Sequence, residues 1–240
     1  VPASVITPVR WVVRTTAPWY IEGVQPEQLP DLLHAQFMVG VEDRAASFPT
    51  ARGAVLVVAD GAGGIGGGAA AAEAVVAAVA SALDIDSAER WVELLARVDT
   101  DLRLGETTAV VCAVVGDLVV GASVGDSGAL RINHRDGSID ELTQDQRRKP
   151  LLGSGRAIPV PFTANLADAT LLLATDGLLK YTSAERIAAC VVTPDLEAVP
   201  PRLVDLVRLR SSALPDDIGI ALARHRAATC ANHSGAQLPD

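Results

Sequence analysis

Apolar and polar positions divide the 240-residue chain into short apolar runs and longer mixed segments. The short runs are rich in Val, Ile and Leu and are bounded by Gly, Asp or Pro, a pattern typical of buried strands. Strands are predicted for residues 9–16, 36–48, 53–59, 108–116, 118–125, 129–133, 169–175 and 217–225. Helices are predicted for residues 68–83, for 87–103 with Ser87 as N-cap, for a segment ending at 191 and capped by Thr182 or Ser183, and for 201–213.

The order of these elements favours an α+β fold. Turn signals separate the strands between residues 107 and 143, which predicts an antiparallel meander. Residues 17–33, which contain three prolines, and residues 144–168 are interpreted as connections. Because the helices fall into two groups and do not alternate with strands, a layered α+β domain is predicted in place of a doubly wound βαβ fold.

The composition narrows the class of protein. Apolar residues make up 49% of the chain and charged residues 20%, which allows a sizeable core. A formal net charge of -9 argues against a nucleic-acid partner but leaves metal cations open. The three cysteines are widely spaced and form no C-x-x-C, so neither a zinc site nor a disulfide framework is indicated. We therefore expect a reduced, cytoplasmic setting.

Targeting and membrane signals are weak. The first residues lack the basic start and apolar stretch of a signal peptide. Residues 61–83 are rich in Gly and Ala and are interrupted by Glu73, which is too weakly apolar for a membrane span. A soluble protein is expected.

Residues 54–83 run from an apolar strand through a glycine-rich turn into an alanine-rich helix. Gly61, Gly63 and Gly66 spell G-x-G-x-x-G, which can mark a dinucleotide-binding turn. That interpretation needs a second strand ending in an acid about 20 residues further on, and no such strand is predicted. Two alternatives stay open: the glycines permit a tight turn and close helix packing, or they let backbone groups approach a metal ion held by Asp60.

Asp60 is one of five aspartates that lie at the ends of predicted strands. The others are Asp43, Asp126, Asp176 and Asp216. Any single one is ordinary turn chemistry, but five at one rim of a sheet would repel one another unless divalent cations neutralised them. All are hard oxygen ligands without His or Cys among them, which favours Mg²⁺ or Mn²⁺ over Zn²⁺ or Cu²⁺.

Six short motifs occur in an order and spacing similar to those of the metal-dependent serine/threonine protein phosphatases, the type-2C or PPM family. They are VEDR, VVADGAGG, TTAVV…VGDSGAL, LTQDQ, LLLATDGLLKYTSAE and PDDIGIAL, within residues 36–225. The resemblance implies a four-layer α-β-β-α sandwich with a central antiparallel β-sandwich, helices on both faces and a two-metal centre at one end. The expected organisation is an N-terminal extension with a first strand (1–35), a phosphatase domain (36–226) and a disordered tail (227–240).

The resemblance also implies a role for each matching residue. Asp60 would bridge both metal ions, and the Gly61 carbonyl would bind the second of them. Asp176 and Asp216 would hold the first ion. Asp126 matches the acid that binds a third, weaker ion.

Further residues match positions near the metals. Glu42 and Asp43 correspond to an acidic pair that contacts metal-bound waters, and Asp43 is counted among the metal ligands. Asp217 stands where the family has Asn or Asp and is expected to act through water. Thr107 and Thr108 match the TT pair of the family, although the start of a strand explains them equally well.

The implied reaction is hydrolysis of phosphoserine or phosphothreonine in proteins by water activated between two Mn²⁺ or Mg²⁺ ions, with a third ion at Asp126. Asp60, Asp176 and Asp216 would act catalytically through that water. The implied partners are a phosphorylated protein and a cognate serine/threonine kinase. A monomer is favoured.

The sequence departs from the family pattern where phosphate binding and proton transfer are concerned. Met38 stands where the family often has a phosphate-gripping arginine. Arg44 could replace it or could be a solvated surface residue. Ala62 and Ile65 stand in place of a histidine proposed as general acid, and losing such an acid costs on the order of 10² to 10⁴ in rate.

Two basic features have more than one interpretation. The segment after LTQDQ is shorter than is usual in the family. It contains a cluster of basic residues, Arg147, Arg148, Lys149 and Arg156. This cluster would either contact a phosphopeptide or keep a surface loop solvated. Lys180 stands where an acid often follows the DG turn. These departures motivate an alternative function, a catalytically weak or inactive phosphatase-fold protein that binds a phosphoprotein or regulatory partner. The complete carboxylate set favours the enzyme.

Overall fold

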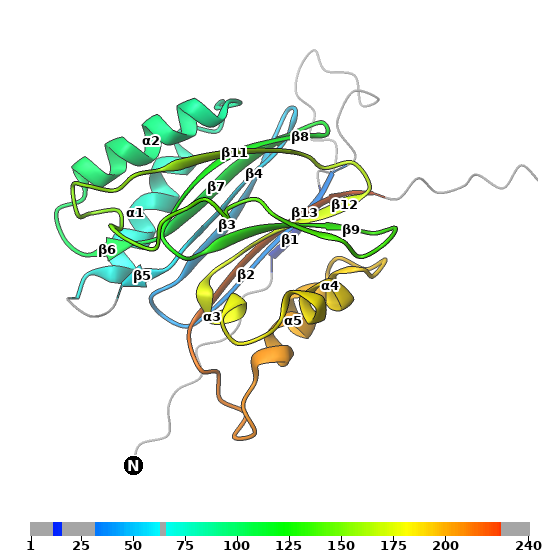
Figure 1. The fold of residues 1–240 in the computed structure, drawn as a ribbon. Coiled ribbons are helices and arrows are strands. Elements are labelled where there is room, and N and C mark those ends of the chain that lie inside the picture. Colours follow the sequence, from blue (N-terminus) through cyan, green and yellow to red (C-terminus); the bar gives the residue numbers. More distant parts are fainter. Residues whose placement is uncertain (1–11, 16–31, 63–65, 227–240) are drawn as a thin grey trace, which may run out of the picture.

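The computed structural model describes residues 12–15, 32–62 and 66–226, and in this part of the chain two β-sheets stack face to face (Figure 1). The first sheet contains β1 (Val12–Thr15), β2 (Leu32–Val39), β9 (Gly128–Asn133), β10 (Ile139–Glu141), β12 (Ala169–Ala174) and β13 (Ile218–His225). The second contains β3 (Arg44–Thr50), β4 (Gly53–Ala59), β7 (Ala109–Val115), β8 (Leu118–Val124) and β11 (Val160–Asn165). A short separate pair consists of β5 (Gly61–Ala62) and β6 (Glu106–Thr107).

Helices cover both outer faces of this sandwich (Figure 1). They are α1 (Gly68–Ala80), α2 (Ala88–Asp101), α3 (Asp176–Leu179), α4 (Ala184–Val191) and α5 (Val199–Val207). One apolar cluster lies between α1, α2 and the second sheet, another lies between α4, α5 and the first sheet, and a third lies between the two sheets. The predicted four-layer α-β-β-α architecture is confirmed.

Strand β4 illustrates why continuous apolar runs form the centre of the fold. Every residue of the strand is buried. Val55 and Val57 pack toward the helices, whereas Leu56 and Val58 pack against the first sheet. Since successive side chains of a strand point to opposite faces, a strand between two apolar layers must be apolar throughout.

The strands are antiparallel, and four connections between the described strands cross from one sheet to the other. The first sheet has the order β1-β2-β13-β12-β9-β10 and the second has the order β11-β8-β7-β4-β3. Residues 40–43 lead from β2 into β3, and residues 125–127 lead from β8 into β9. The expected meander is therefore divided: β7 and β8 pair in the second sheet, and β9 lies in the first.

Three predicted elements are corrected by the structure. Residues 36–48 are not one strand, because the chain turns at Gly40, whose φ of +115° suits glycine, and changes sheets. The expected loop 144–168 contains β11, an edge strand in which only Phe162 is buried, so its sequence lacks a strong apolar pattern. The last helix begins at Val199 and ends at Val207, earlier than expected.

Other expectations are confirmed or lie outside the described residues. Ser87 caps α2, and its side chain accepts a hydrogen bond from the backbone N–H of Arg90. Ser183 is the N-cap of α4. Residues 1–11, 16–31, 63–65 and 227–240 are not described, and these ranges include most of the expected N-terminal extension and the whole expected tail.

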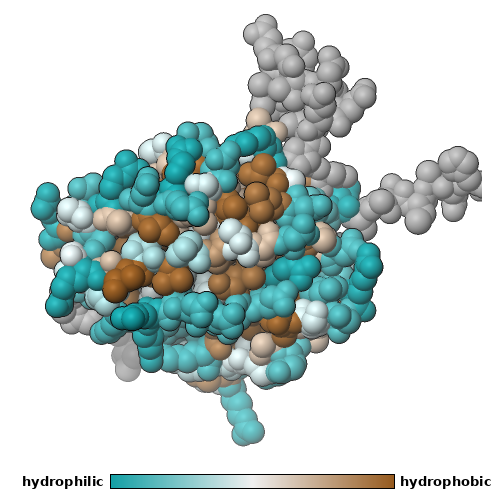
Figure 2. All heavy atoms as spheres, turned by 45° about the horizontal axis from the view of Figure 1, so that its top comes forward, coloured by the Kyte–Doolittle hydropathy of each residue, from teal (hydrophilic) through white to brown (hydrophobic). Residues whose placement is uncertain are grey.

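The face in Figure 2 is mostly hydrophilic, with apolar side chains gathered in a few patches. Large apolar side chains that are exposed in the described ranges include Leu118 and Ile158. None of the helices that the structure describes has the length and apolar character needed to cross a membrane.

Residues 144–159, which we name the flap, lie in the connection from β10 to β11 and are anchored to α2 by one carboxylate. Asp99 is only 6% exposed and accepts hydrogen bonds from the backbone N–H groups of Gly153, Gly155 and Ala157 at 2.8, 3.0 and 2.9 Å. Three donors on one anionic side chain fix the course of this irregular segment over the sheet edge.

We expect Asp99→Asn to destabilise the protein by about 1–3 kcal/mol, because the amide loses the charge and turns one end into a donor facing N–H groups. Urea denaturation followed by circular dichroism measures this change. Asp101→Asn, an exposed position on the same helix, is the matched control. A loss no larger than that of the control would contradict the anchoring role.

Candidate metal centre

Three aspartates from both sheets converge at one end of the sandwich. Asp60 directly follows β4, Asp126 lies in the connection from β8 to β9, and Asp176 follows β12 as the first residue of α3. Each offers a carboxylate oxygen, and these three oxygens lie within 4.8 Å of one another. The antiparallel sheets thus bring together residues that are far apart in sequence.

Asp43 lies beside this group in the turn between β2 and β3. It is only 3% exposed, and among the described residues its Oδ2 has no hydrogen-bond partner. Burial raises its pKa to about 8, the charges of Asp60 and Asp217 add to this effect, and a hydrogen bond with Thr175 opposes it. A buried carboxylate oxygen that lacks a donor is well suited to a cation.

Asp60 has a similarly perturbed carboxyl group. Burial raises its pKa to about 6, and the negative charge of Asp176 is the next largest contribution. The charges of Asp126 and Asp216 raise this pKa further, whereas hydrogen bonding to Asp43 lowers it. The direction of these shifts means that the folded chain resists full ionisation of the cluster when no cation is present.

Asp217 holds the turn that carries the acidic pair. Its Oδ2 accepts hydrogen bonds from the backbone N–H groups of Val41 and Glu42, both at 2.7 Å. Glu42 is half-buried in this turn. Asp217 therefore contacts the backbone of the pair directly and positions it.

Asp216 lies close to Gly177, the residue after Asp176, but outside the three-carboxylate group. Its side chain accepts a hydrogen bond from the backbone N–H of Asp217 at 3.0 Å, and the residue is exposed. Gly177 allows the start of α3 to approach this segment, because a Cβ at Gly177 would lie 1.8 Å from the Asp217 carbonyl oxygen. The glycine of the DG turn is thus required by a close backbone contact.

The two threonines of the TT pair clamp the backbone of Asp60. Thr107 donates its hydroxyl to the Asp60 carbonyl at 2.8 Å, and the Thr108 hydroxyl accepts from the Asp60 N–H at 2.9 Å. Thr108 also hydrogen-bonds Ser127, the neighbour of Asp126, at 2.6 Å. The pair therefore links the two segments that carry Asp60 and Asp126. The sequence pattern could not distinguish this role of the threonines from the start of a strand.

The glycine-rich stretch has no dinucleotide-binding topology in the described residues. β4 pairs with β3 and β7, both antiparallel, whereas a dinucleotide-binding unit needs a parallel neighbour. Gly61 and Gly68 lie in close contact, since a Cβ at Gly61 would be 2.4 Å from the Gly68 carbonyl carbon. The packing interpretation is supported for Gly61 and Gly68, and the positive φ of Gly66, +75°, agrees with a tight turn, whereas Gly63 lies outside the described residues. Both are compatible with a metal-binding Asp60.

Arg44 is committed to other contacts. Its Nε donates to Glu73 at 2.6 Å, and one terminal nitrogen donates to the carbonyls of Val41 and Asp43 at 3.0 and 2.8 Å. These contacts fix the turn between β2 and β3. They give no support to Arg44 as a phosphate ligand.

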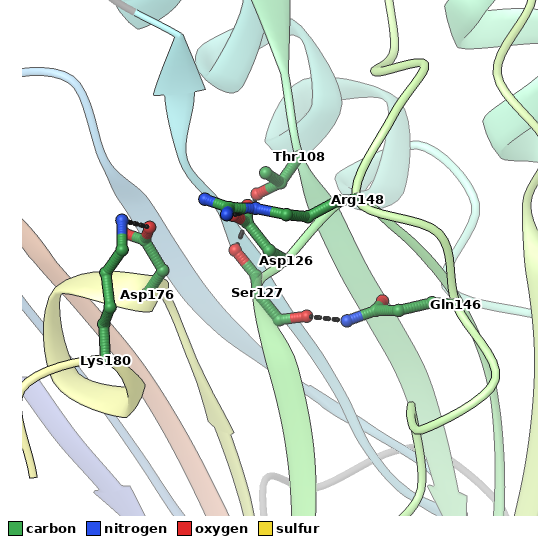
Figure 3. Close-up of polar contacts among 7 residues, drawn as sticks. All are labelled: Thr108, Asp126, Ser127, Gln146, Arg148, Asp176 and Lys180. Atoms are coloured by element: carbon green, nitrogen blue, oxygen red, sulfur yellow. Dashed lines mark hydrogen bonds and ion pairs between the residues drawn. The ribbon is translucent and has the colours of Figure 1, made fainter.

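Two other basic residues, neither of which was predicted as a site residue, contact the carboxylates directly (Figure 3). The Nε of Arg148 donates to Asp126 at 2.7 Å, and the Nζ of Lys180 donates to Asp176 at 2.9 Å. Lys180 is four residues after Asp176, a spacing that favours such a contact on a helix. The Arg148 contact joins the flap to the turn after β8 and has no comparable local signal.

The donor set fits a hard divalent cation. The three clustered ligands are carboxylates, the buried Asp43 oxygen adds a fourth candidate, and no cysteine or histidine belongs to the described cluster. Oxygen-only donors are the ligands that Mg²⁺ and Mn²⁺ prefer. Carboxylates that lie this close together are also best accommodated when a cation lies between them.

A large cavity lies elsewhere in the molecule. It has a volume of about 860 Å³ and is lined by residues that include His134, Arg224 and His225. His225 ends β13, whereas Asp216 and Asp217 precede the same strand, so the cavity and the carboxylates lie toward opposite ends of it.

Comparison with solved structures identifies the fold. The staphylococcal serine/threonine phosphatase Stp1 from Staphylococcus aureus is 24% identical, with 85% of this chain and 99% of that chain covered and a TM-score of 0.68. The Mycobacterium tuberculosis phosphatase PstP is 23% identical, with 80% and 98% covered and a TM-score of 0.64. An arginine-to-glutamate variant of a bacterial serine phosphatase is 26% identical, with 79% and 96% covered and a TM-score of 0.67.

The chain therefore has the fold of the bacterial serine/threonine phosphatases. The similarity that the six motifs show to the PPM family is confirmed at the level of the fold. No protein-family model matches the sequence, and a search of curated proteins found no match. A further solved structure, the catalytic domain of PstP in complex with two manganese ions, is 23% identical with a TM-score of 0.63.

We expect Asp43→Asn to stabilise the metal-free protein, with an advantage that grows from about pH 4 to about pH 8. Because the folded pKa is raised from 3.8 to about 8, the stabilising proton on Asp43 is fully present below the unfolded value and is lost as the pH rises through the folded value. Melting temperatures in EDTA across this pH range measure the effect.

Asp101→Asn is the control for a change of net charge at an exposed carboxylate. Mn²⁺ should reverse the order of stability, since the variant lacks an anionic oxygen at this position. An advantage of Asp43→Asn that stays constant with pH would contradict the raised pKa.

Proposed function

We propose that this chain is a metal-dependent phosphatase that hydrolyses phosphoserine and phosphothreonine in proteins. The observation that carries the proposal is the convergence of Asp60, Asp126 and Asp176, whose oxygens lie within 4.8 Å, in the fold of the bacterial serine/threonine phosphatases. Metal-assisted hydrolysis is the chemistry that such an oxygen-only acidic cluster serves.

The carboxylates divide into metal ligands and positioning groups. Asp60, Asp176 and Asp216, with the Gly61 carbonyl, are the proposed ligands of two Mn²⁺ or Mg²⁺ ions, and Asp126 is the proposed ligand of a third. When bound, these ions supply an activated water and stabilise the charge that develops on the phosphoryl oxygens.

The acidic pair between β2 and β3 has a supporting role in the proposal. Asp43, held by Thr175, would bind a cation or its water through the oxygen that has no hydrogen-bond partner in the described residues. Glu42 would accept a proton or hydrogen bond from a water at the site, and Asp217 keeps its backbone in place through the 2.7 Å contact.

Covalent catalysis by cysteine is disfavoured in the described part of the chain. Cys112 is buried in β7, and burial raises the pKa of its thiol. Burial also raises the pKa of the Cys190 thiol. Because the thiolate is the nucleophile, neither cysteine is activated at neutral pH, which agrees with direct attack by water.

Proton transfer to the leaving group is the weakest part of the proposed catalyst. Ala62 stands where a histidine would be expected, and the histidines at 34, 134 and 225 hydrogen-bond or pair elsewhere. Losing a general acid matters least when the leaving group is already a weak base. Aryl phosphates should therefore be hydrolysed faster than alkyl phosphates such as phosphoserine.

The biological setting that we propose is the reversal of a serine/threonine kinase by a monomer in a reducing, cytoplasmic environment. The phosphatase domain would extend over residues 36–226 with β1 added at the edge of the first sheet, where it pairs with β2. A net charge of -9 disfavours a nucleic-acid partner.

A binding protein without useful turnover is the second candidate. Met38 replaces the expected phosphate-binding arginine, and Arg148 and Lys180 form ion pairs with two of the three clustered carboxylates. Such a protein would bind a phosphoprotein and would not release phosphate from it.

We expect hydrolysis of p-nitrophenyl phosphate that requires Mn²⁺ or Mg²⁺ and stops in EDTA. Asp60→Asn and Asp176→Asn should reduce it to the level of the metal-free protein, because each removes an anionic ligand of the cluster. Asp101→Asn, which lies on the far helix α2 and is exposed, should retain wild-type turnover.

Turnover is measured by release of nitrophenol, and metal binding by isothermal titration calorimetry of the same proteins. Metal binding without turnover would favour the binding-protein candidate. Turnover that survives in both variants would reject the carboxylate cluster as the active site.

A further inference from the structure

Arg148 and Lys180 each contact one carboxylate of the cluster (Figure 3). The Arg148 side chain is 70% exposed and its partner Asp126 26% exposed; the Lys180 side chain is 49% exposed and its partner Asp176 16% exposed. In both pairs the cation is thus the outer member. A substrate that enters from solvent would meet these cations before it meets the carboxylates.

The backbone on both sides of Arg148 is fixed. The Nε2 of Gln146 donates to the carbonyl of Ser127 at 2.6 Å, which ties the start of the flap to the turn that carries Asp126. Further along, Leu152 and Thr107 exchange two backbone hydrogen bonds of 3.0 and 3.1 Å. Arg148 therefore extends from a segment held at two points and is not a freely placed surface residue.

Lys180 is fixed in a similar way by the short helix α3. Its backbone N–H donates to the carbonyl of Asp176 at 2.9 Å, and its side chain returns to the carboxylate of the same residue. The partners of Lys180 and Arg148, Asp176 and Asp126, offer oxygens within 4.8 Å of each other. The two cations therefore contact the same carboxylate cluster.

Binding of divalent cations would change the partners of both basic groups. Asp126 and Asp176 would then direct their oxygens to metal ions, whose charge repels an arginine or a lysine. Two adjacent cations would be left at the mouth of the site without an anion. A phosphate dianion is the ligand whose charge and acceptor oxygens match such a pair.

The other residues that could bind the phosphate are less suitable in the described structure. The guanidinium of Arg44 is bound to Glu73 and to two carbonyls, and Met38 has no charge. Arg147 is exposed, and no contact joins it to the cluster.

We propose that Arg148 and Lys180 bind the phosphate group of the substrate, and that they leave Asp126 and Asp176 for the phosphate when metal ions bind. This inference rests on the proposed phosphatase function and assigns the phosphate-binding groups of the same site. Each cation exchanges one anionic partner for another. The site thus keeps its charge balanced in the metal-free and in the substrate-bound state.

The proposal predicts two effects of opposite sign for the same substitution. Arg148→Gln and Lys180→Gln remove a competitor for the carboxylates, so the affinity for Mn²⁺ should rise. They also remove a charged donor to phosphate, so the affinity of the Mn²⁺-loaded protein for inorganic phosphate should fall about tenfold for each variant. A residue with a merely structural role would weaken both interactions or neither.

The experiment measures Mn²⁺ binding to the metal-free full chain by calorimetry, and inorganic phosphate as a competitive inhibitor of the Mn²⁺-loaded enzyme. KM for a phosphothreonine peptide should rise in both variants with a smaller change in kcat, since the lost contact stabilises ground state and transition state alike. Arg148→Lys should recover part of the phosphate affinity. Arg147→Gln, with the same loss of charge at the adjacent residue, should behave as the wild type.

The possible results separate the two proposals. Wild-type turnover together with unchanged phosphate affinity in both variants would overturn the role of Arg148 and Lys180 and leave the phosphatase function intact. Equal losses in Arg147→Gln would also overturn it, because a general effect of charge would then explain the data. A wild-type protein that binds no Mn²⁺ would overturn the phosphatase function and, with it, this inference.

Discussion

Repulsion among the carboxylates at one end of the sandwich opposes folding whenever no cation is bound. Asp60, Asp126 and Asp176 bring oxygens within 4.8 Å of one another, and the buried Asp43 lies beside them. Burial raises the pKa values of Asp43 and Asp60 most strongly, and the charges of neighbouring aspartates raise them further. The three apolar clusters of the four-layer fold stabilise the arrangement, and they extend to residues directly beside the carboxylates, such as Ala59, Val124 and Ala174. The apolar strands thus end at the acidic residues that they position.

The acidic residues are held mainly through their backbones. Thr107 and Thr108 clamp the main chain of Asp60, and Asp217 accepts hydrogen bonds from the turn that precedes Asp43. The threonine contacts fix the backbone of Asp60 and do not use its carboxylate oxygens. This division explains why threonines and a second aspartate accompany the ligands. A metal site needs this support, because ligands that repel one another would otherwise separate.

Sequence reasoning succeeded where a single physical rule determined the outcome. Strands such as β4 and β12 are buried on both faces, so their apolar runs identified them and placed Asp60 and Asp176 at their ends. Asp126 marks a point where the chain crosses between sheets, and such turns favour aspartate. Strand β11 escaped detection because only Phe162 in it is buried. The contact of Arg148 with Asp126 could not be read from the sequence, since it depends on how the flap lies over the strands.

The charge of the whole molecule and the charge at the site have different consequences for a phosphorylated substrate. A net charge of -9 would repel a phosphate dianion if every charge acted at long range. At physiological ionic strength, however, exposed charges are screened over about 8 Å, so the groups nearest the site dominate. Arg148 and Lys180 are the cations in contact with the described cluster, and bound metal ions would add positive charge at the same place. A strongly acidic protein can therefore present a locally positive mouth to its substrate, provided that the carboxylates beneath are occupied by metal.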